Sequence, residues 1–235
     1  MLSIRTDLLN PTLAKVLKTF KLDKTFVRGK GNYLYDDQGN KYLDFIAQYG
    51  AVPFGYNPDF VWEALERVKS EQIPSLVQPS LPHEPLRLAN RLADLTPGDI
   101  CYATFCQSGA EAVEAAIKLA RSATGKLTII STYKSFHGKT LGALSATGRE
   151  VYQTPFGAPA PGFAYIPFND ADALADVLAA NNDVAAFIVE PVQGEGGMIP
   201  ARPGYLKAVQ QLCNEHGVVF IADEIQTGLG RTGYM

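Results

Sequence analysis

Two acidic residues each follow an apolar run that is typical of a buried strand. Val184–Val189 leads directly into Glu190, and Val218–Ala222 leads directly into Asp223. Neither run alternates with polar residues, which favours strands buried on both faces, as in a parallel sheet. A carboxylate at such a strand end costs free energy unless a partner satisfies it. A helix cap or salt bridge would explain one acid, but two acids at matching ends, each followed by Gln and Gly, favour a polar ligand site.

Two further segments offer groups for an anion and for a flat ligand. Residues 108–111, Ser-Gly-Ala-Glu, open a predicted helix whose first backbone N–H groups suit a phosphate, although many such turns are only caps. Residues 136–140, Phe-His-Gly-Lys-Thr, follow a predicted strand and could stack on a flat ligand and contact an anion. A surface loop with a hydrogen-bonded structural histidine explains the second segment equally well, so His137 is not assigned as a catalytic base.

Composition and motifs argue against several other functions. The chain has 235 residues and a net charge of -3, which indicates neither a nucleic-acid footprint nor a polybasic membrane patch. The glycine-rich loop Gly228–Gly233 lacks the strand-turn-helix context of a dinucleotide site. The sequence shows no phosphate loop of the pattern Gly-x4-Gly-Lys-Ser/Thr, no Gly-x-Ser-x-Gly elbow and no zinc-type spacing of His and Cys, so we expect no metal.

The cysteines and the beginning of the chain bear on the cellular setting. The three cysteines are Cys101, Cys106 and Cys213, and the first two lie in an apolar run, where we expect small core residues. This odd number fits a reducing, cytoplasmic setting. Met1–Phe20 contains no apolar stretch long enough for a signal peptide, and no later run is long enough to span a membrane.

The elements that position these residues can be predicted from their periodicity. The first part favours a small α+β lobe with an antiparallel hairpin, in which strands are expected at Phe26–Arg28, Tyr33–Asp36 and Lys41–Phe45. In the later residues, predicted helices and strands alternate. The first helix is capped by Asn57 and has Pro58 in its first position, and a second helix is expected at Leu86–Leu95. A strand at Cys101–Phe105, a helix at Gly109–Arg121 and a strand at Leu127–Ser131 follow, and a further helix, which ends at Gly217, lies between the two buried strands. The predicted fold class is therefore α/β, with a mainly parallel sheet and helices on both faces.

Four blocks of sequence, in this order, resemble the class III aminotransferases that depend on pyridoxal phosphate, such as the ornithine, acetylornithine, 4-aminobutyrate and putrescine aminotransferases. The blocks are Ser108–Arg121 (SGAEAVEAAIKLAR), Phe136–Thr140 (FHGKT), Glu190–Gly197 (EPVQGEGG), and Asp223–Gly228 (DEIQTG) with Gly230–Gly233 (GRTG). The resemblance covers the chain from about Phe26 to Gly233. It implies the fold-type I architecture, with residues 1–50 forming the N-terminal part of a small domain and residues 51–235 an incomplete large cofactor-binding domain.

The resemblance also implies roles around the cofactor ring. Asp223 matches the acid that pairs with the pyridine nitrogen and keeps it protonated, so that the ring can accept electrons. Phe136 matches the residue stacked on one ring face, and Ile225 is expected on the other face. Gln226 matches the partner of the ring hydroxyl, and His137 is counted among the residues at the cofactor.

The remaining roles concern the phosphate and the substrate. Gly109 and Ala110 match the phosphate cradle, Glu190 is expected to support the site from beneath, and Glu195 resembles a gating glutamate in the substrate pocket. Lys139 stands where members with acidic substrates carry Arg, and Lys cannot reproduce the two-pronged contact of Arg with a carboxylate. This departure, and a likeness of residues 138–147 to putrescine-type members, favours a diamine or another ω-amino donor, with a 2-oxo acid as acceptor.

The Schiff-base lysine of the family follows the ring-pairing acid by about thirty residues. Met235 lies twelve residues after Asp223, so the lysine and the arginine partner of Glu195 are expected beyond Met235. No catalytic residue is therefore assigned within this chain, which alone should be inactive. It would be the N-terminal half of a longer aminotransferase, homodimeric when complete, or else a non-catalytic remnant. A fold-type I decarboxylase or racemase is disfavoured by the block Gly194–Gly197.

Overall fold

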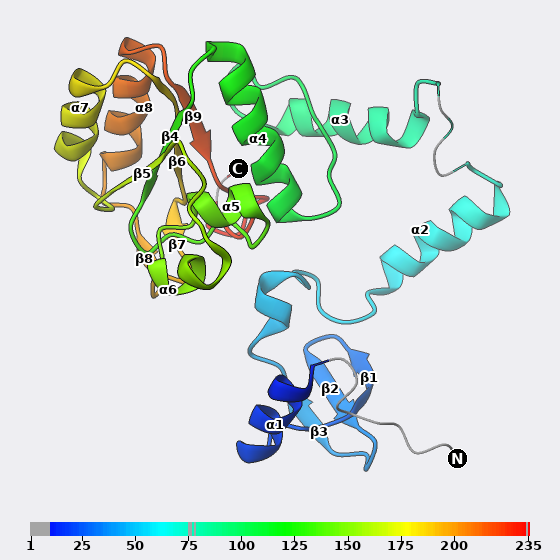
Figure 1. Ribbon diagram of the computed structural model, residues 1–235. Coiled ribbons are helices and arrows are strands. Elements are labelled where there is room, and N and C mark those ends of the chain that lie inside the picture. The colour runs from blue at the N-terminus through cyan, green and yellow to red at the C-terminus, as the bar shows by residue number, and fades with distance from the viewer. Residues whose placement is uncertain (1–9, 75–76, 78, 234) are drawn as a thin grey trace. The chain divides into compact units, whose positions relative to one another are not determined.

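The computed structural model describes residues 10–74, 77, 79–233 and 235, so residues 1–9 of the stretch examined for a signal peptide lie outside it. The chain divides into two compact units, residues 1–80 and 81–235, and each is described by itself (Figure 1). The expected division of the complete enzyme into residues 1–50 and 51–235 stays a prediction.

The first unit is built on a three-stranded antiparallel sheet, with β1 (Phe26–Lys30), β2 (Tyr33–Asp36) and β3 (Lys41–Leu43) in chain order. Before the sheet comes α1 (Pro11–Thr19), and after it come a 3-10 turn, η1 (Ala47–Gly50), and α2 (Asp59–Ser70). The turn between β2 and β3 is fixed by Asp36, whose carboxylate accepts hydrogen bonds from the backbone N–H groups of Gln38 and Asn40 and from the side chains of Asn40 and Tyr42. The hairpin predicted from this sequence is therefore present.

The predicted beginning of α2 was wrong by one residue. Asn57 does not cap the helix, because its backbone is left-handed at φ +50° and its side-chain amide donates to the carbonyl oxygen of Gly29 at 2.7 Å. Pro58 occupies the cap position and Asp59 begins the helix. The competing hydrogen bond ties the residues before α2 to β1, a long-range contact that the local sequence pattern does not reveal.

The second unit contains a four-stranded parallel sheet in the order β5-β4-β6-β9, formed by β4 (Thr128–Thr132), β5 (Phe163–Ile166), β6 (Val184–Val189) and β9 (Val219–Ala222). Every residue of β6 is buried, as expected for a strand covered on both faces. The helix between β6 and β9 is α8 (Tyr205–Glu215), and Gly217 follows it with φ +62°. The α/β class and the parallel sheet are confirmed.

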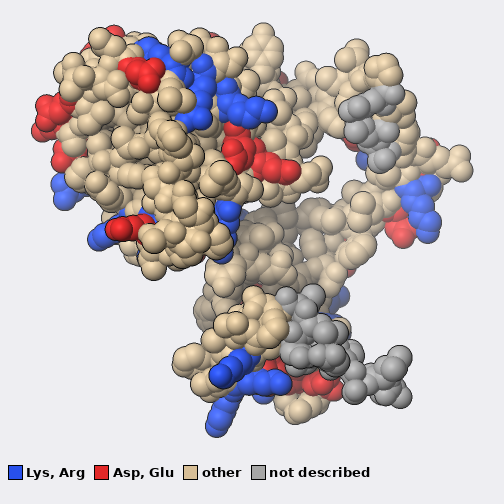
Figure 2. Space-filling model, in the orientation of Figure 1, with Lys and Arg blue, Asp and Glu red and all other residues tan. Residues whose placement is uncertain are grey.

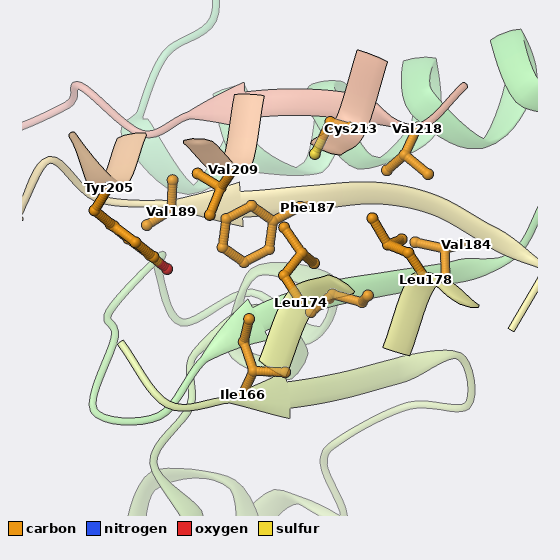
Figure 3. Packing of buried hydrophobic residues seen from close by; sticks show 11 residues of the cluster. Ile166, Leu174, Leu178, Val184, Phe187, Val189, Tyr205, Val209, Cys213 and Val218 are labelled. Carbon is orange, nitrogen blue, oxygen red and sulfur yellow. The ribbon is translucent and has the colours of Figure 1, made fainter. Parts of the chain in front are cut away.

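Helices cover both faces of this sheet. On one face, α7 (Ala171–Ala180) and α8 bury Leu174 and Val209 against Phe187 of β6 (Figure 3). On the other face, α4 (Gly109–Thr124) buries Val113 and Ile117, and α5 (Leu141–Ala146) buries Ala143 and Ala146. Figure 1 shows α7 and α8 together on one side of the strands and α4 on the other. These two cores hold the strand ends in place, and therefore also the loops that follow them.

The predicted strand at Cys101–Phe105 was wrong. Residues 101–106 are exposed and have no regular secondary structure, so Cys101 and Cys106 are not core residues, whereas Cys213 is buried. A strand needs a partner for its backbone hydrogen bonds. Within the described part of the chain, no neighbouring strand pairs with this apolar run.

The remaining elements of the second unit are short apart from one helix. They are α3 (His83–Leu95), α6 (Glu150–Gln153), a 3-10 turn, η2 (Thr154–Phe156), and the antiparallel pair β7 (Val192–Gln193) and β8 (Ile199–Pro200).

On the face that Figure 2 shows, basic and acidic side chains lie scattered among uncharged ones. Among the described residues, no helix combines the length and apolar character needed to cross a membrane.

Candidate cofactor site

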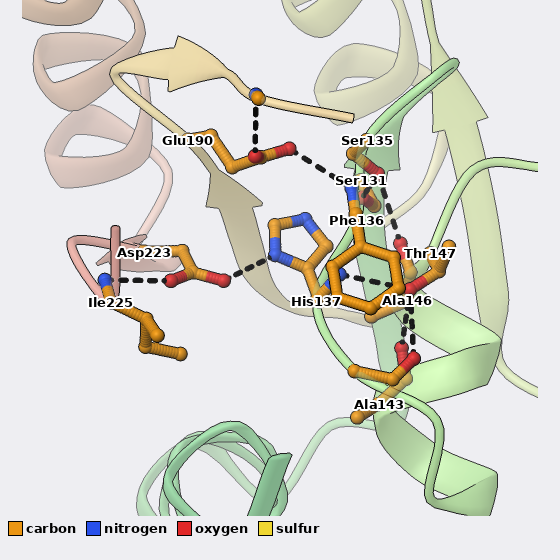
Figure 4. A network of polar contacts seen from close by, with 12 residues as sticks. Ser131, Ser135, Phe136, His137, Ala143, Ala146, Thr147, Glu190, Asp223 and Ile225 are labelled. Atoms are coloured by element: carbon orange, nitrogen blue, oxygen red, sulfur yellow. Dashed lines mark hydrogen bonds and ion pairs between the residues drawn. The ribbon is translucent and has the colours of Figure 1, made fainter. Parts of the chain in front are cut away.

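The second acid of the sequence analysis is held in a buried pair. Asp223 follows β9, and its Oδ2 lies 2.6 Å from Nδ1 of His137, with the two residues 8% and 2% exposed (Figure 4). A carboxylate only accepts, so the ring donates from Nδ1. The other carboxylate oxygen of Asp223, Oδ1, accepts from the backbone N–H of Ile225 at 3.1 Å. These contacts leave acceptor capacity on a carboxylate whose position is fixed by the protein.

The first acid supports the loop that carries His137. Glu190 follows β6 and accepts from the backbone N–H of Phe136 at 2.9 Å and from that of Gly194 at 3.2 Å. Burial raises the pKa of this carboxyl, while the two backbone hydrogen bonds and the nearby His137 act in the opposite direction. Glu190 thus connects two loops at the carboxyl ends of the strands, which fits its expected place beneath the site.

The beginning of α4 contributes free backbone donors. Ser108 caps the helix by accepting from the N–H of Glu111 at 3.2 Å, and the Glu111 carboxylate accepts from the N–H of Gln107 at 2.8 Å. This reciprocal capping box satisfies the third N–H of the helix. In the described chain, the N–H groups of Gly109 and Ala110 make no hydrogen bond, so they remain available to an anion.

Glycines allow these three segments to meet. A Cβ on Gly109 would lie 2.9 Å from Cγ2 of Ile225, so Ile225 packs directly over the first residue of α4. Gly138 has φ +133°, and a Cβ there would lie 2.8 Å from Cβ of Ala110 and 2.9 Å from Cβ of Ala143. The loop after β4, the beginning of α4 and the loop after β9 therefore form one site.

The other predicted residues lie at its edges. A side chain at Gly194 would collide with Gln226, which places Gln226 against the loop that Glu190 holds. The Lys139 ammonium lies 6.0 Å from the centroid of the Phe136 ring. The Glu195 carboxylate lies 3.6 Å from Nη1 of Arg149, which also donates to the Glu195 backbone carbonyl at 2.8 Å. The expected arginine partner of Glu195 beyond Met235 stays a prediction, and Arg149 contacts Glu195 in this chain.

Sequence reasoning missed three supporting residues. Thr147 accepts from the N–H of His137 at 2.9 Å, and it belongs to the run 138–147 that carried part of the resemblance. The Glu114 carboxylate on α4 accepts from the Thr140 hydroxyl at 2.7 Å and from the Gly142 N–H at 2.8 Å. Arg149 stands in no motif, so no signal in a single sequence could have identified it.

Pyridoxal phosphate carries an anionic phosphate, a flat ring and a ring nitrogen, and the hydrogen-bonding groups of this site can be compared with each of them. The two free N–H groups of α4 suit the phosphate, and Asp223 has acceptor capacity for a protonated ring nitrogen. Nε2 of His137 is buried without a partner in the described chain, so the site also holds an unsatisfied polar atom. Within the described ranges, no group of three His, Cys, Asp or Glu side chains could hold a metal ion. The residues present fit the group.

Comparisons with a protein family, with a curated relative and with solved structures all find aminotransferases. The family model for class III aminotransferases matches residues 18–235. The chain is 41% identical over 226 residues to the aminotransferase PigE of Serratia sp. (strain ATCC 39006), covering 96% of this chain and 26% of PigE. It therefore spans about a quarter of that relative's length.

Solved structures of transaminases share the fold. The ornithine aminotransferase of Toxoplasma gondii, described with pyridoxal phosphate at partial occupancy in its active site, superposes with a TM-score of 0.79 at 30% identity and covers 95% of this chain. A transaminase from the marine bacterium Virgibacillus superposes with a TM-score of 0.84 at 28% identity, also over 95% of this chain. The chain spans 55% and 57% of these two proteins, about half of each.

Proposed function

Because the chain belongs to the class III aminotransferases, we propose that it forms the ring- and phosphate-binding half of an enzyme that moves an amino group from an amine to a 2-oxo acid. Pyridoxal phosphate is the cofactor of this family. The observation that carries the proposal is the buried contact of 2.6 Å between His137 and Asp223, which lies beside the free N–H groups of α4.

When bound, pyridoxal phosphate supplies a ring that draws electrons away from the substrate carbon next to the amino group. Asp223 holds a proton at the ring nitrogen, because a carboxylate stabilises the protonated pyridine. His137 orients Asp223 through Nδ1, and Thr147 and Glu190 hold the loop on which His137 lies. Gly109 and Ala110 bind the phosphate, and Phe136 and Ile225 restrict the position of the ring.

The complete enzyme is proposed to have further parts. The lysine that holds the cofactor covalently lies beyond Met235, and the active form is a homodimer. We favour a diamine or another ω-amino donor, since Lys139 cannot make the two-pronged contact of an arginine with a carboxylate. The three free cysteines favour a cytoplasmic, reducing setting.

The test uses the complete protein saturated with pyridoxal phosphate and given 2-oxoglutarate. The donors are 1-aminopentane, 1,4-diaminobutane and L-ornithine, and formation of glutamate is measured together with release of carbon dioxide. We expect glutamate from at least one donor, and less of it when Asp223 is replaced by Asn. Carbon dioxide from ornithine without glutamate would show a decarboxylase, and D-ornithine as the only product would show a racemase.

The non-catalytic remnant makes a different prediction. The intact mass of the protein from its own source should exceed the 25.5 kDa of this chain if the chain is part of a longer enzyme. A mass of 25.5 kDa would limit the proposal to cofactor binding without turnover.

A further inference from the structure

One face of the antiparallel sheet in the first unit combines basic and aromatic side chains. On the middle strand β2, Tyr35 is paired with Arg28 of β1 and with Lys41 of β3, and Tyr33 is paired with Lys30 and Leu43. Paired residues project from the same face of a sheet, and so do alternate residues of one strand. Three cations on the outer strands therefore flank two tyrosines on the middle strand (Figure 1). The basic-aromatic face consists of Arg28, Lys30, Tyr33, Tyr35, Lys41 and Leu43.

The two faces of this sheet differ in their surroundings. On the opposite face, Asp36 is 3% exposed and accepts a hydrogen bond from the Tyr42 hydroxyl. A Cβ on Gly29 would lie 2.8 Å from the ring of Tyr56, so that face is covered by the residues before α2. All six residues of the basic-aromatic face are exposed or half-buried, and Tyr33 has an exposed fraction of 37%. Within the first unit, the basic-aromatic face is therefore the outward one.

The positive charge of this face has no counterpart on it. Within the described residues, none of its three cations forms a salt bridge. The carboxylates of Asp36 and Asp44 are each occupied by a tyrosine hydroxyl and by backbone N–H groups, and Asp23 and Asp37 lie outside the three strands. The net charge of -3, from which no nucleic-acid footprint was expected, averages over the whole chain. It does not show this face, because only the pairing of the strands brings the cations together.

Contacts within the face hold two of the cations over the rings. Cζ of Arg28 lies 3.7 Å from the centroid of the Tyr35 ring, and Nζ of Lys41 lies 3.7 Å from the centroid of the Tyr33 ring. The negative face of an aromatic ring attracts a cation but does not neutralise its charge. A ligand that fits this face therefore combines several negative charges with flat groups that can stack.

We propose that the basic-aromatic face binds a single-stranded nucleic acid, with phosphates on the cations of the outer strands and bases stacked on the middle strand. Exposed rings on a sheet stack unpaired bases, and a guanidinium plane does so as well, so Arg28 over Tyr35 is compatible with stacking. An acidic peptide would supply carboxylates but no flat groups for the two tyrosines. Leu43 is the one aliphatic residue of the face, which is too little apolar surface to anchor it in a membrane.

The test is the fluorescence anisotropy of a labelled oligothymidylate of about twelve nucleotides, titrated with the complete protein. Binding should weaken by about tenfold as the salt concentration rises from about 50 to about 200 mM, because phosphate contacts release counterions. R28Q/K41Q should weaken binding at the lower salt concentration by about tenfold and should also flatten the salt dependence. Y33L should weaken binding by about tenfold through lost stacking, but should leave the salt dependence unchanged.

Matched variants separate this face from charges and rings elsewhere in the protein. K118Q/K207Q removes two exposed lysines, from α4 and α8, and Y102L removes a ring that is 95% exposed. Both should bind the oligonucleotide as the unmodified protein does.

Three results would overturn the proposal: no binding, an equal loss of binding in the matched variants, or equal binding of a duplex of the same length, whose bases are not free to stack. Displacement of the labelled strand by polyglutamate as readily as by unlabelled oligothymidylate would also overturn it and would indicate an acidic protein segment as the partner. The measurement contains no amine and no 2-oxo acid, so its outcome is independent of the proposed aminotransferase reaction.

Discussion

At the scale of single residues, the account depends most on Asp223. Replacing Asp223 by Asn keeps the shape but removes the negative charge that would stabilise a protonated ring nitrogen. We expect kcat/KM of the complete enzyme to fall by a factor on the order of 10² and the cofactor to dissociate more readily. Absorbance titration with pyridoxal phosphate and steady-state kinetics measure the two effects. Asp176 on α7 is exposed, so Asp176→Asn serves as the matched control and should behave as the unmodified enzyme.

Asp36 should contribute to the acid sensitivity of the first unit. Hydrogen bonds, chiefly from the Asn40 side chain, lower the pKa of Asp36 from its ordinary value of 3.8 to about 2. As the pH falls from 3.8 towards 2, the unfolded chain therefore binds more protons at position 36 than the folded chain does. The free energy of unfolding rises with pH in this range, so the contribution of Asp36 to stability is lost as the pH falls through it.

Asp36→Asn should therefore weaken this pH dependence of unfolding and lower stability at neutral pH. Trp62 is the one tryptophan of the chain, so its fluorescence during urea unfolding of the 235-residue chain, followed at high dilution to limit self-association, reports on the first unit. Asp37→Asn changes the exposed neighbour of Asp36 and should leave the pH dependence intact. An unchanged pH dependence in Asp36→Asn would contradict the assignment.

At the scale of elements, the beginning of α4 should combine stability with anion binding. Ser108→Ala removes the cap of α4, and Asp170→Ala removes the corresponding cap of α7, where Asp170 accepts from the Ala173 N–H at 2.9 Å. Each change should lower the free energy of unfolding by about 1 kcal/mol. Only Ser108→Ala should also weaken binding of pyridoxal phosphate to the complete protein. Equal binding in both variants would argue against a phosphate at α4.

The strands and helices around the site could be predicted because their signals are local. The uninterrupted apolar residues of β6 indicated a strand covered on both faces, and the helix predicted at Gly109–Arg121 is α4, which buries Val113 and Ile117. The strand β5 and the helix α7 were missed, although Asp170 before Leu174 and Leu178 was a usable helix signal. The strand expected at Cys101–Phe105 failed because apolar composition alone does not provide a pairing partner.

The assembly of the site was predictable only in part. Strand ends in a parallel sheet lie at one edge, so a meeting of the Glu190 and Asp223 loops followed from the pattern. The contact of His137 with Asp223 joins residues 86 positions apart and depends on the path of the loop after β4. The pairing of Arg149 with Glu195 depends on the packing of α6, which has only four residues and no periodicity to read.

At the scale of the whole molecule, exposed apolar surface predicts association. Large hydrophobic side chains are exposed in both units, including Phe45 at 89%, Tyr49 at 80% and Tyr102 at 95%. Extensive surface of this kind marks interfaces. We expect the complete protein to sediment as a homodimer and the isolated 235-residue chain to self-associate or precipitate. Equilibrium sedimentation that finds only monomer for the complete protein would refute the dimer.

The measurement that tests the central claim most directly is the location of the covalently held cofactor. The complete protein, loaded with pyridoxal phosphate, is reduced with borohydride, digested, and searched by mass spectrometry for the modified lysine. The account predicts a single phosphopyridoxyl lysine in a segment that follows Met235, with the yield reduced in Asp223→Asn. A modified lysine within residues 1–235, such as Lys139, or no stoichiometric adduct at all, would contradict the claim that this chain supplies the ring and phosphate contacts while the lysine comes from beyond it.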